Sequence, residues 1–471
     1  MQTSSQRMSR VDTAWLRMDN DVNLMMIVGV WLLQPGIAHV ALCERVEDKL
    51  LKYERFRQKV VPDAMGATWV PDTAFDVKRH VLHQKLHPER GQSEREALQA
   101  LVGELANTPL DPDHPLWQFH LIDAYEGGSA LVARVHHCIG DGIALISVMM
   151  AITDGGIDPP RRKQRELPES EGDWLSDAVM KPLTDLATKA IGMYGGVGKT
   201  MEMLSNPQQG LLGGIEMARL GAKVLGDVGA MALMADDSPT LLKGKPIGQK
   251  IVAWGEPLPL DQVKAIGKAL DCSINDVLLA CVAGAIGGYL REQGDDPTGK
   301  EIRAMVPINL RPIEEAWKLG NRFGLAPLTL PIGIDNPVER VYAVRVRMNQ
   351  LKDSYQPLLA FALLAVAGLL IKPVQDGLLG LFAKKATAVM TNVPGPAVPL
   401  KFCGATLRQT MFWVPASRDI GVGVSILSYG GGVQFGLITD RRLCPHPQQI
   451  IDRFEPEFEK LLLMTMMLPW A

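Results

Sequence analysis

The chain has 471 residues, of which 47% are hydrophobic and 21% charged, and its formal net charge is −3. This length is typical of two or three domains with a large core, and so apolar a composition excludes disorder as the dominant state. The 49 basic residues nearly balance the 52 acidic ones, and no long basic run is present. We therefore expect no nucleic-acid partner. The high apolar content, including 22 methionines, needs another explanation.

Two apolar runs are candidates for a membrane span, residues 24–33 and 357–371. Both are shorter than the roughly 18 residues that a spanning helix needs, and they predict a buried strand and a core or interfacial helix. The polar N-terminal residues predict no signal peptide. The six cysteines are scattered without a CxxC pair, so we expect neither disulfides nor a thiolate metal site. These features favour a cytoplasmic location.

Taken in chain order, the patterns predict three segments. Residues 1–157 alternate apolar runs with a helical stretch, as expected of an α/β domain. Residues 158–245 predict a charged and then helical linker. Residues 246–471 again mix the two kinds of element. The predicted strands are 29–33, 67–70, 130–135, 250–254, 302–307, 323–330, 420–427 and 433–438, and the predicted helices are 93–107, 260–270, 274–291 and 338–351.

Two patterns resemble binding motifs without meeting their requirements. The run GGVGKT at residues 195–200 lacks the first glycine of a phosphate-binding loop, since Met193 stands there. His80, His83 and His87 have helical spacing, but no cysteine or carboxylate completes a ligand set, and the local sequence begins like a strand. We expect no metal site.

The segment with the clearest chemistry is HHCIGDG, residues 136–142, which follows a strand-like run and precedes an apolar helical stretch. Consecutive strand residues point to opposite faces, so His136 and His137 cannot face one site in the same way. We expect one to act in chemistry and the other in structure. Histidine suits general-base work because its ordinary pKa of about 6.5 leaves it mostly neutral near pH 7. The alternative is a pair of core histidines.

HHCIGDG resembles the HHxxxDG motif of the CoA-dependent acyltransferase superfamily. Further segments resemble the bacterial wax ester synthase/diacylglycerol acyltransferase family, and the similarity runs from Asp12 and Trp15 to residues 436–437. These segments are PLW (115–117), NDVLLA (275–280), MVPINLRP (305–312), GNRFG (320–324) and TNVPGP (391–396). One departure lies near the N-terminus, where members often carry PMHVG and this chain has LMMIVG at residues 24–29.

The resemblance implies an α/β fold of two chloramphenicol-acetyltransferase-like domains joined by a helical linker, with the active site in a tunnel between them. It implies that His137 is the general base, with His136 and Gly142 in the same motif. The base takes a proton from a hydroxyl of a long-chain alcohol or diacylglycerol as the oxygen attacks acyl-CoA, the co-substrate. A separate strong acid is not required, since the CoA thiolate is a good leaving group. No metal or bound cofactor is implied.

The resemblance also assigns supporting residues. It makes Asp141 a structural residue that pairs with Arg311, and it places Asn275 near the active centre. Asp276 fits a capping box with Ser273, so we expect it to start a helix. Pro115, Leu116 and Trp117 are expected at the wall of the acyl channel, with core packing as the alternative.

Two other functions remain open from the sequence. One is a condensation-type acyltransferase acting on an amine or a carrier-bound acceptor, and the other is a non-catalytic protein that binds a lipid surface. The apolar surplus has two expected destinations, an acyl tunnel and helices lying against the inner membrane or a lipid droplet. The segments expected at such a surface are 211–235, 357–371 and 461–470. The sequence leaves the oligomeric state open.

Overall fold

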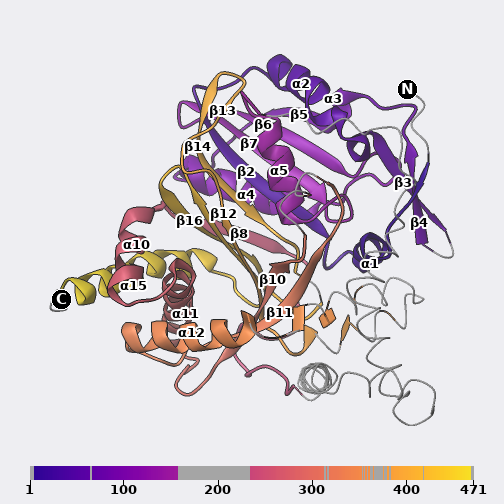
Figure 1. The fold of residues 1–471 in the computed structure, drawn as a ribbon. Helices are drawn as coiled ribbons and strands as arrows, with labels where there is room; N and C mark the ends of the chain where they lie inside the picture. The colour runs from indigo at the N-terminus through magenta and orange to yellow at the C-terminus, as the bar shows by residue number, and fades with distance from the viewer. Residues whose placement is uncertain are drawn as a thin grey trace, which may run out of the picture.

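The protein is described from a computed structural model that covers residues 5–63, 66–156, 234–311, 318–352, 383–416 and 418–467, with a few single residues between these ranges. Most of the predicted linker, the GGVGKT run and most of the apolar run 357–371 lie outside the described residues. The described chain forms two mixed sheets with helices packed on them, and a smaller third sheet (Figure 1).

The first large sheet has six strands, and its neighbours are antiparallel except for one parallel pair, β5 with β6. In spatial order these strands are β13 (Lys401–Phe402), β14 (Ala405–Trp413), β2 (Met26–Gln34), β7 (Gly128–His136), β6 (Trp117–Tyr125) and β5 (Val81–Lys85). The two central strands, β2 and β7, are almost fully buried. This sheet therefore forms the core of the N-terminal half.

Helices and a short sheet surround this core. A capping box of Ser93 and Glu96 begins α4 (Glu94–Asn107), whose apolar residues pack between this sheet and the second one. The remaining elements of the N-terminal half are α1 (Arg10–Met18), α2 (His39–Asp48), α3 (Val77–His80), α4 (Glu94–Asn107), α5 (Gly142–Ala151), two 3₁₀ turns (Leu50–Lys52 and Glu54–Arg57), and the sheet of β1 (Gln6–Arg7), β4 (Gly66–Pro71) and β3 (Gln58–Asp63).

The second large sheet has seven strands and contains both parallel and antiparallel pairs. In spatial order they are β11 (Phe323–Leu330), β10 (Ile302–Asn309), β12 (Ala388–Pro394), β15 (Val422–Tyr429), β16 (Gly432–Asp440) and β8 (Lys250–Trp254), with β9 (Leu258–Pro259) also paired to β16. The pairs of β12 with β10 and β15 are parallel. The sequence predicted five of these strands to within a few residues.

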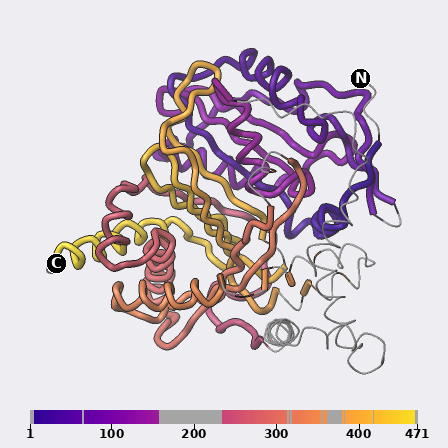
Figure 2. The backbone as a smooth tube through the Cα atoms, in the orientation of Figure 1, coloured from indigo at the N-terminus to yellow at the C-terminus, as the bar shows by residue number. Residues whose placement is uncertain are grey.

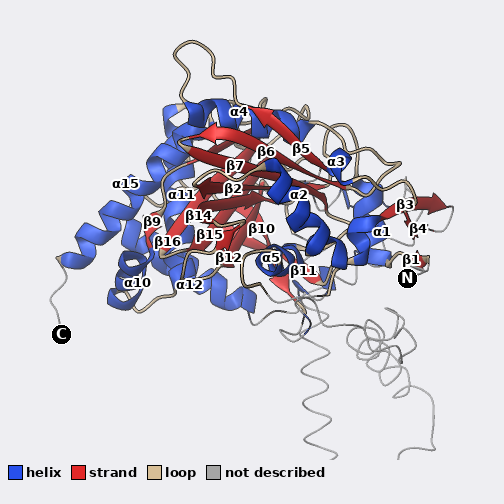
Figure 3. Cartoon of the chain, turned by 90° about the horizontal axis from the view of Figure 1, so that it is seen from above, coloured by secondary structure: helices blue, strands red, loops and turns tan. Residues whose placement is uncertain are grey.

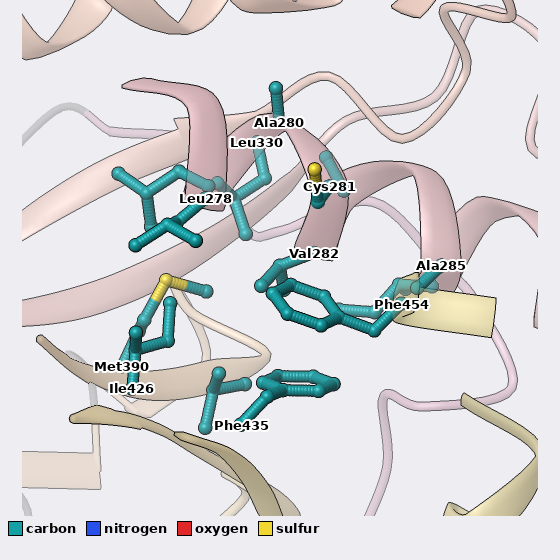
Figure 4. Close-up of a cluster of buried hydrophobic side chains, with 14 of the residues drawn as sticks. Leu278, Ala280, Cys281, Val282, Ala285, Leu330, Met390, Ile426, Phe435 and Phe454 are labelled. Atoms are coloured by element: carbon teal, nitrogen blue, oxygen red, sulfur yellow. The ribbon is translucent and has the colours of Figure 1, made fainter. Parts of the chain in front are cut away.

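Four helices cover this sheet: α10 (Leu260–Ala269), α11 (Ile274–Glu292), α12 (Pro337–Lys352) and α15 (Pro447–Met466). Figure 4 shows side chains of α11, such as Leu278 and Val282, packed with Phe435 of the sheet and Phe454 of α15. By length and composition α11 could cross a membrane, alone among the helices of the described residues, but 78% of its apolar window is buried in the protein. It is therefore the core helix of the C-terminal half.

One pair of strands crosses between the two halves. β13 and β14 belong to the sequence predicted as the C-terminal domain, yet β14 pairs with β2 of the first sheet. Figure 2 shows this late segment lying among strands from the beginning of the chain. The C-terminal half of the sequence therefore supplies two strands to the sheet of the N-terminal half. The predicted division at residues 157 and 246 does not include this exchange of strands.

Candidate active site

The HHCIGDG segment occupies the junction between β7 and α5. β7 ends at His136, and Asp141 is the N-cap of α5, with its Oδ1 accepting a hydrogen bond from the Ala144 amide at 2.9 Å. The amides of the two histidines donate to residues that directly precede neighbouring strands, His136 to the Leu116 carbonyl before β6 at 2.9 Å and His137 to the Met25 carbonyl before β2 at 2.7 Å. The sheet therefore fixes the main chain of both histidines.

His136 has a structural environment. It is buried, its Nδ1 accepts a hydrogen bond from the Cys138 amide at 3.1 Å, and its Nε2 lies 3.8 Å from a carboxylate oxygen of Asp19. An Nδ1 that accepts is unprotonated, so the Nε2–H tautomer points toward Asp19. The lone pair of His136 Nδ1 is therefore already used by the Cys138 amide of the same turn.

His137 lies in an aromatic environment. Its ring stacks on the indole of Trp15, with centroids 4.1 Å apart and planes 9° apart, and the Phe323 ring lies 5.6 Å away. The residue is only 2% exposed, and its buried Nδ1 has no hydrogen-bond partner. Burial lowers the pKa of His137 to about 4 because desolvation penalises the charged ring. The imidazole is therefore neutral near pH 7.

The backbone carbonyl of His137 accepts from a network of buried hydrogen bonds. Asn321 Nδ2 donates to this carbonyl at 2.8 Å and to Asp12 Oδ1 at 2.6 Å. The other oxygen of Asp12 accepts from Arg55 Nη1 at 3.1 Å, and the same guanidinium nitrogen donates to the Ile139 carbonyl at 3.0 Å. The network links α1, the histidine turn and the GNRFG segment.

The expected contact between Asp141 and Arg311 is present. Arg311 Nη2 donates to Asp141 Oδ2 at 2.8 Å and to the Gly320 carbonyl at 2.6 Å, and the Arg322 amide donates to the same carboxylate oxygen at 2.9 Å. Both side chains are at least 95% buried. A backbone bridge between Gly140 and Gly320 completes the joint. Asp141 thus joins the histidine turn to the second half of the chain, and its contacts are those of a structural residue.

An apolar pocket lies beside this turn. Its walls are almost entirely apolar, as in sites that bind hydrophobic small molecules. Alternate residues of β2 and β7 form one wall, and α5, β14 and the Gly395–Pro396 turn form the others. The lining residues are Ile27, Gly29, Trp31, Leu131, Ala133, Val135, Gly142, Leu145, Ile146, Met149, Met150, Gly395, Pro396, Leu400, Leu407, Thr410, Met411, Phe412, Leu427 and Tyr429. Val135 and Gly142 flank His137 in sequence, so the pocket borders the histidine turn.

Asn275 and Asp276 have different environments at the start of α11. The capping box is confirmed: Asp276 Oδ2 accepts from the Ser273 amide at 2.8 Å, and Ser273 Oγ accepts from the Asp276 amide at 3.2 Å. Asn275 is exposed, and its Oδ1 accepts from Asn392 Nδ2 at 2.8 Å. Asn392 belongs to the TNVPGP segment, whose Gly395 and Pro396 line the pocket. A substrate-binding role for Asn275 stays a prediction.

The PLW segment packs behind the site. Leu116 and Trp117 are buried, which favours the core-packing alternative, and neither lines this pocket. The wall role stays a prediction. Trp117 stacks on His80 and donates from its indole nitrogen to the Phe56 carbonyl at 2.9 Å. The Pro115 carbonyl accepts from the Trp117 amide at the start of β6. The contribution of PLW is core packing and the Leu116 carbonyl that holds His136.

Several site residues were not singled out for a role by the sequence. Asp12, Trp15 and Asn321 appeared only within stretches of family similarity, and the pocket residues of β2 and β14 had no signal beyond their apolar character. Within the described ranges, no group of three or more His, Cys, Asp or Glu residues is placed to hold a metal ion. His80 is instead buried between aromatic rings, and His83 pairs with Asp123.

The fold is that of chloramphenicol-acetyltransferase-like enzymes. The wax ester synthase/diacylglycerol acyltransferase of Marinobacter aquaeolei VT8 superposes with a TM-score of 0.64 at 20% identity, covering 98% of this chain and 100% of that one. The first condensation domain of the calcium-dependent antibiotic synthetase superposes with a TM-score of 0.61 at 13% identity, covering 99% and 97%. Identities this low establish the fold and leave the chemistry to other evidence.

Sequence similarity establishes the family. Residues 8–278 match the wax ester synthase/diacylglycerol acyltransferase catalytic domain, and residues 319–462 match the C-terminal domain of the same family. The chain therefore belongs to the wax ester synthase/diacylglycerol acyltransferase family and is an O-acyltransferase that forms wax ester or triacylglycerol. This confirms the predicted family, fold class and type of enzyme.

Two named relatives are similar along most of the chain. One is tgs1 of Mycobacterium tuberculosis strain H37Rv, named as a diacylglycerol O-acyltransferase, which is 25% identical over 97% of this chain and 96% of that protein. The other is Mb0919 of Mycobacterium bovis, also named as a diacylglycerol O-acyltransferase, which is 29% identical over 84% of this chain and 77% of that protein.

Proposed function

We propose that the enzyme transfers a fatty acyl group from acyl-CoA to a hydroxyl group, with His137 as the general base. The observation that carries this proposal is a neutral, buried imidazole in the turn between Val135 and Gly142, both of which line an apolar pocket. A neutral ring has a lone pair available for a hydroxyl proton near pH 7. The pocket offers the low-polarity walls that an acyl chain requires.

The reaction is proposed to proceed in two proton transfers. His137 takes the hydroxyl proton as the acceptor oxygen forms a bond to the thioester carbonyl carbon. The tetrahedral intermediate then breaks its carbon–sulfur bond, and the departing thiolate takes the proton back from the imidazolium. Because burial disfavours the charged ring, the imidazolium returns its proton readily. The base is restored, and the products are ester and free CoA.

The chemistry assigned to this site requires no metal or bound cofactor. A thiol has an ordinary pKa near 8.5, so the CoA thiolate leaves without a separate strong acid. Positioned base catalysis typically contributes about 10²- to 10⁴-fold. The remaining acceleration is assigned to holding both substrates in reach of one another.

A direct assay tests this proposal. Purified protein is offered palmitoyl-CoA with hexadecanol, diacylglycerol or a short alcohol in parallel reactions that contain no carrier protein. We expect ester product and an equal amount of free CoA with at least one long-chain acceptor. Product only in the presence of a carrier-bound or amine acceptor would contradict the proposal and favour a condensation-type reaction.

We also propose that the enzyme is a cytoplasmic protein that works at the surface of the inner membrane or of a lipid droplet. The end of α15 supports this. Leu463, Met464, Met466 and the C-cap residue Met467 are between 41% and 84% exposed, whereas Leu461 and Thr465 of the helix are buried. This end of α15 projects from the body of the protein (Figure 3). An exposed apolar stripe on a helix is typical of a segment that enters a lipid interface.

Vesicle sedimentation tests the lipid contact. The double variant Leu463→Ser/Met467→Ser should bind vesicles of phosphatidylcholine and phosphatidylglycerol less than the unmodified protein does. Val40→Ser is the control, because Val40 is exposed on α2, which lies on a different side of the protein from α15 (Figures 1 and 3). Equal sedimentation of the double variant and the unmodified protein would contradict a role for this end of α15.

A further inference from the structure

The helix that carries Trp15, α1, packs against the histidine turn. Ser9 is the N-cap of α1, and its Oγ accepts a hydrogen bond from the Asp12 amide at 2.8 Å. Asp12 and Trp15 are three positions apart, so both side chains lie on one face of the helix. That face is buried: Asp12 is 0% exposed and Trp15 is 5% exposed.

The two side chains contact His137 at different points. Trp15 covers a face of the imidazole with nearly parallel planes, and Phe323 lies 5.8 Å from the indole and 5.6 Å from the imidazole. Asp12 acts on the main chain, because Asn321 Nδ2 bridges Asp12 Oδ1 and the His137 carbonyl. One helix therefore contacts the ring and, through Asn321, fixes the backbone of the same residue.

We propose that Trp15 is a positioning residue, which holds the His137 ring in one orientation before substrate binds, while Asp12 and Asn321 hold its backbone. This inference rests on the proposed role of His137 as the base. To rotate out of line, the imidazole must displace an indole that is packed against Val11, Met25 and Phe323. A base whose orientation is fixed in advance needs no reorganisation at the moment of proton transfer.

The stack has a second consequence for the ring, which is the exclusion of water. The charged and titratable groups around His137 are His136, Asp141 with Arg311, and Asp12 with Arg55. Each of the two carboxylates is paired with an arginine. Burial therefore remains the largest influence on the pKa of His137, and it favours the neutral ring. Opening the indole side to water should raise the pKa of His137 toward its ordinary value of about 6.5.

Three variants test the inference: Trp15→Phe, which keeps a flat ring, Trp15→Leu, which keeps apolar bulk without a ring, and the control Trp254→Leu. Trp254 is a fully buried tryptophan that packs on Trp413 in a separate cluster. We expect Trp15→Phe to keep kcat within about threefold. Trp15→Leu should lose roughly 10- to 100-fold in kcat with little change in KM for acyl-CoA.

The pH profile separates positioning from stability. In Trp15→Leu the acid limb of kcat/KM should move to higher pH, whereas Trp254→Leu should lower the melting temperature and leave both kcat and the acid limb unchanged. A folded Trp15→Leu with the kcat and acid limb of the unmodified enzyme would overturn the inference. If Trp15→Leu fails to fold, Trp15→Met takes its place in the same comparison.

Two further measurements complete the test. In the unmodified protein, the imidazole protons of His137 should resonate upfield because of the indole ring current, and the absence of that shift would overturn the stack itself. His137→Ala is assayed in the same series. An active His137→Ala contradicts the proposed function, whereas an inactive His137→Ala together with a normal Trp15→Leu contradicts only the role of Trp15.

Discussion

The carboxylate of Asp141 accepts a hydrogen bond from Arg311 at 2.8 Å across 170 positions of sequence. The same carboxylate caps α5 through its other oxygen and accepts from the Arg322 amide. It therefore couples the start of the helix after the histidines to the GNRFG segment. The pair is almost completely buried, so neither charge has water to replace a lost partner.

Asp141→Ala should lower the free energy of unfolding by about 3 to 5 kcal/mol, because it leaves the Arg311 charge buried and unpaired. Urea denaturation measures this loss. Asp63→Ala is the matched control, since Asp63 pairs with Arg7 at the exposed surface and such pairs contribute about 0 to 1 kcal/mol. Equal losses in the two variants would show that the buried pair has no special structural role.

The pocket predicts a dependence on acyl chain length. Ala133 of β7 lines the pocket, and Ala133→Leu adds volume to its wall. We expect kcat/KM for palmitoyl-CoA to fall roughly 10-fold relative to octanoyl-CoA, since overfilling an apolar site typically costs about 1 to 3 kcal/mol. Steady-state kinetics with the two donors measures the ratio. An unchanged ratio would place the acyl chain elsewhere.

Buried neutral histidines make stability depend on pH. Burial, together with the nearby Arg134 guanidinium, lowers the pKa of His120 to about 4, and neither ring nitrogen has a hydrogen-bond partner. The unfolded chain takes up a proton near pH 6.5 that the folded chain refuses until about pH 4. Stability therefore rises with pH across this window and is lost as the pH falls.

The contribution of His120 should be about 2 kcal/mol between pH 7 and pH 5. Urea midpoints at these two pH values measure it, with His120→Leu as the variant that removes the titrating group. We expect a smaller difference between the two pH values in His120→Leu than in the unmodified protein. An equal difference would assign the pH dependence to other groups, such as His137.

Contiguous segments were predictable from the sequence. The strand, turn and helix around HHCIGDG follow from local pattern, and the capping box at Ser273 and Asp276 is encoded within four residues. The pairing of Asp141 with Arg311 was expected only because a known family has it. The spacing of these two residues alone carries no such information.

The remaining features of the site depend on tertiary contacts, which the sequence pattern does not reveal. Asp12 binds Asn321 across 309 positions, and the aromatic stack on His137 brings together residues of α1 and the histidine turn. The pocket depends on β14 joining the first sheet beside β2, a register that no local pattern specifies. The wall role of Trp117 depends on tertiary contacts in the same way, because an apolar residue near the site can face the core instead.

The central claim is that His137 is the base, and one comparison tests it most directly. His137→Ala and His136→Ala are purified, shown by circular dichroism to be folded, and assayed for ester formation from palmitoyl-CoA and a long-chain acceptor. We predict that His137→Ala loses at least about 10²-fold in kcat. His136→Ala should keep more activity and lose stability. Full ester formation by folded His137→Ala would contradict the account.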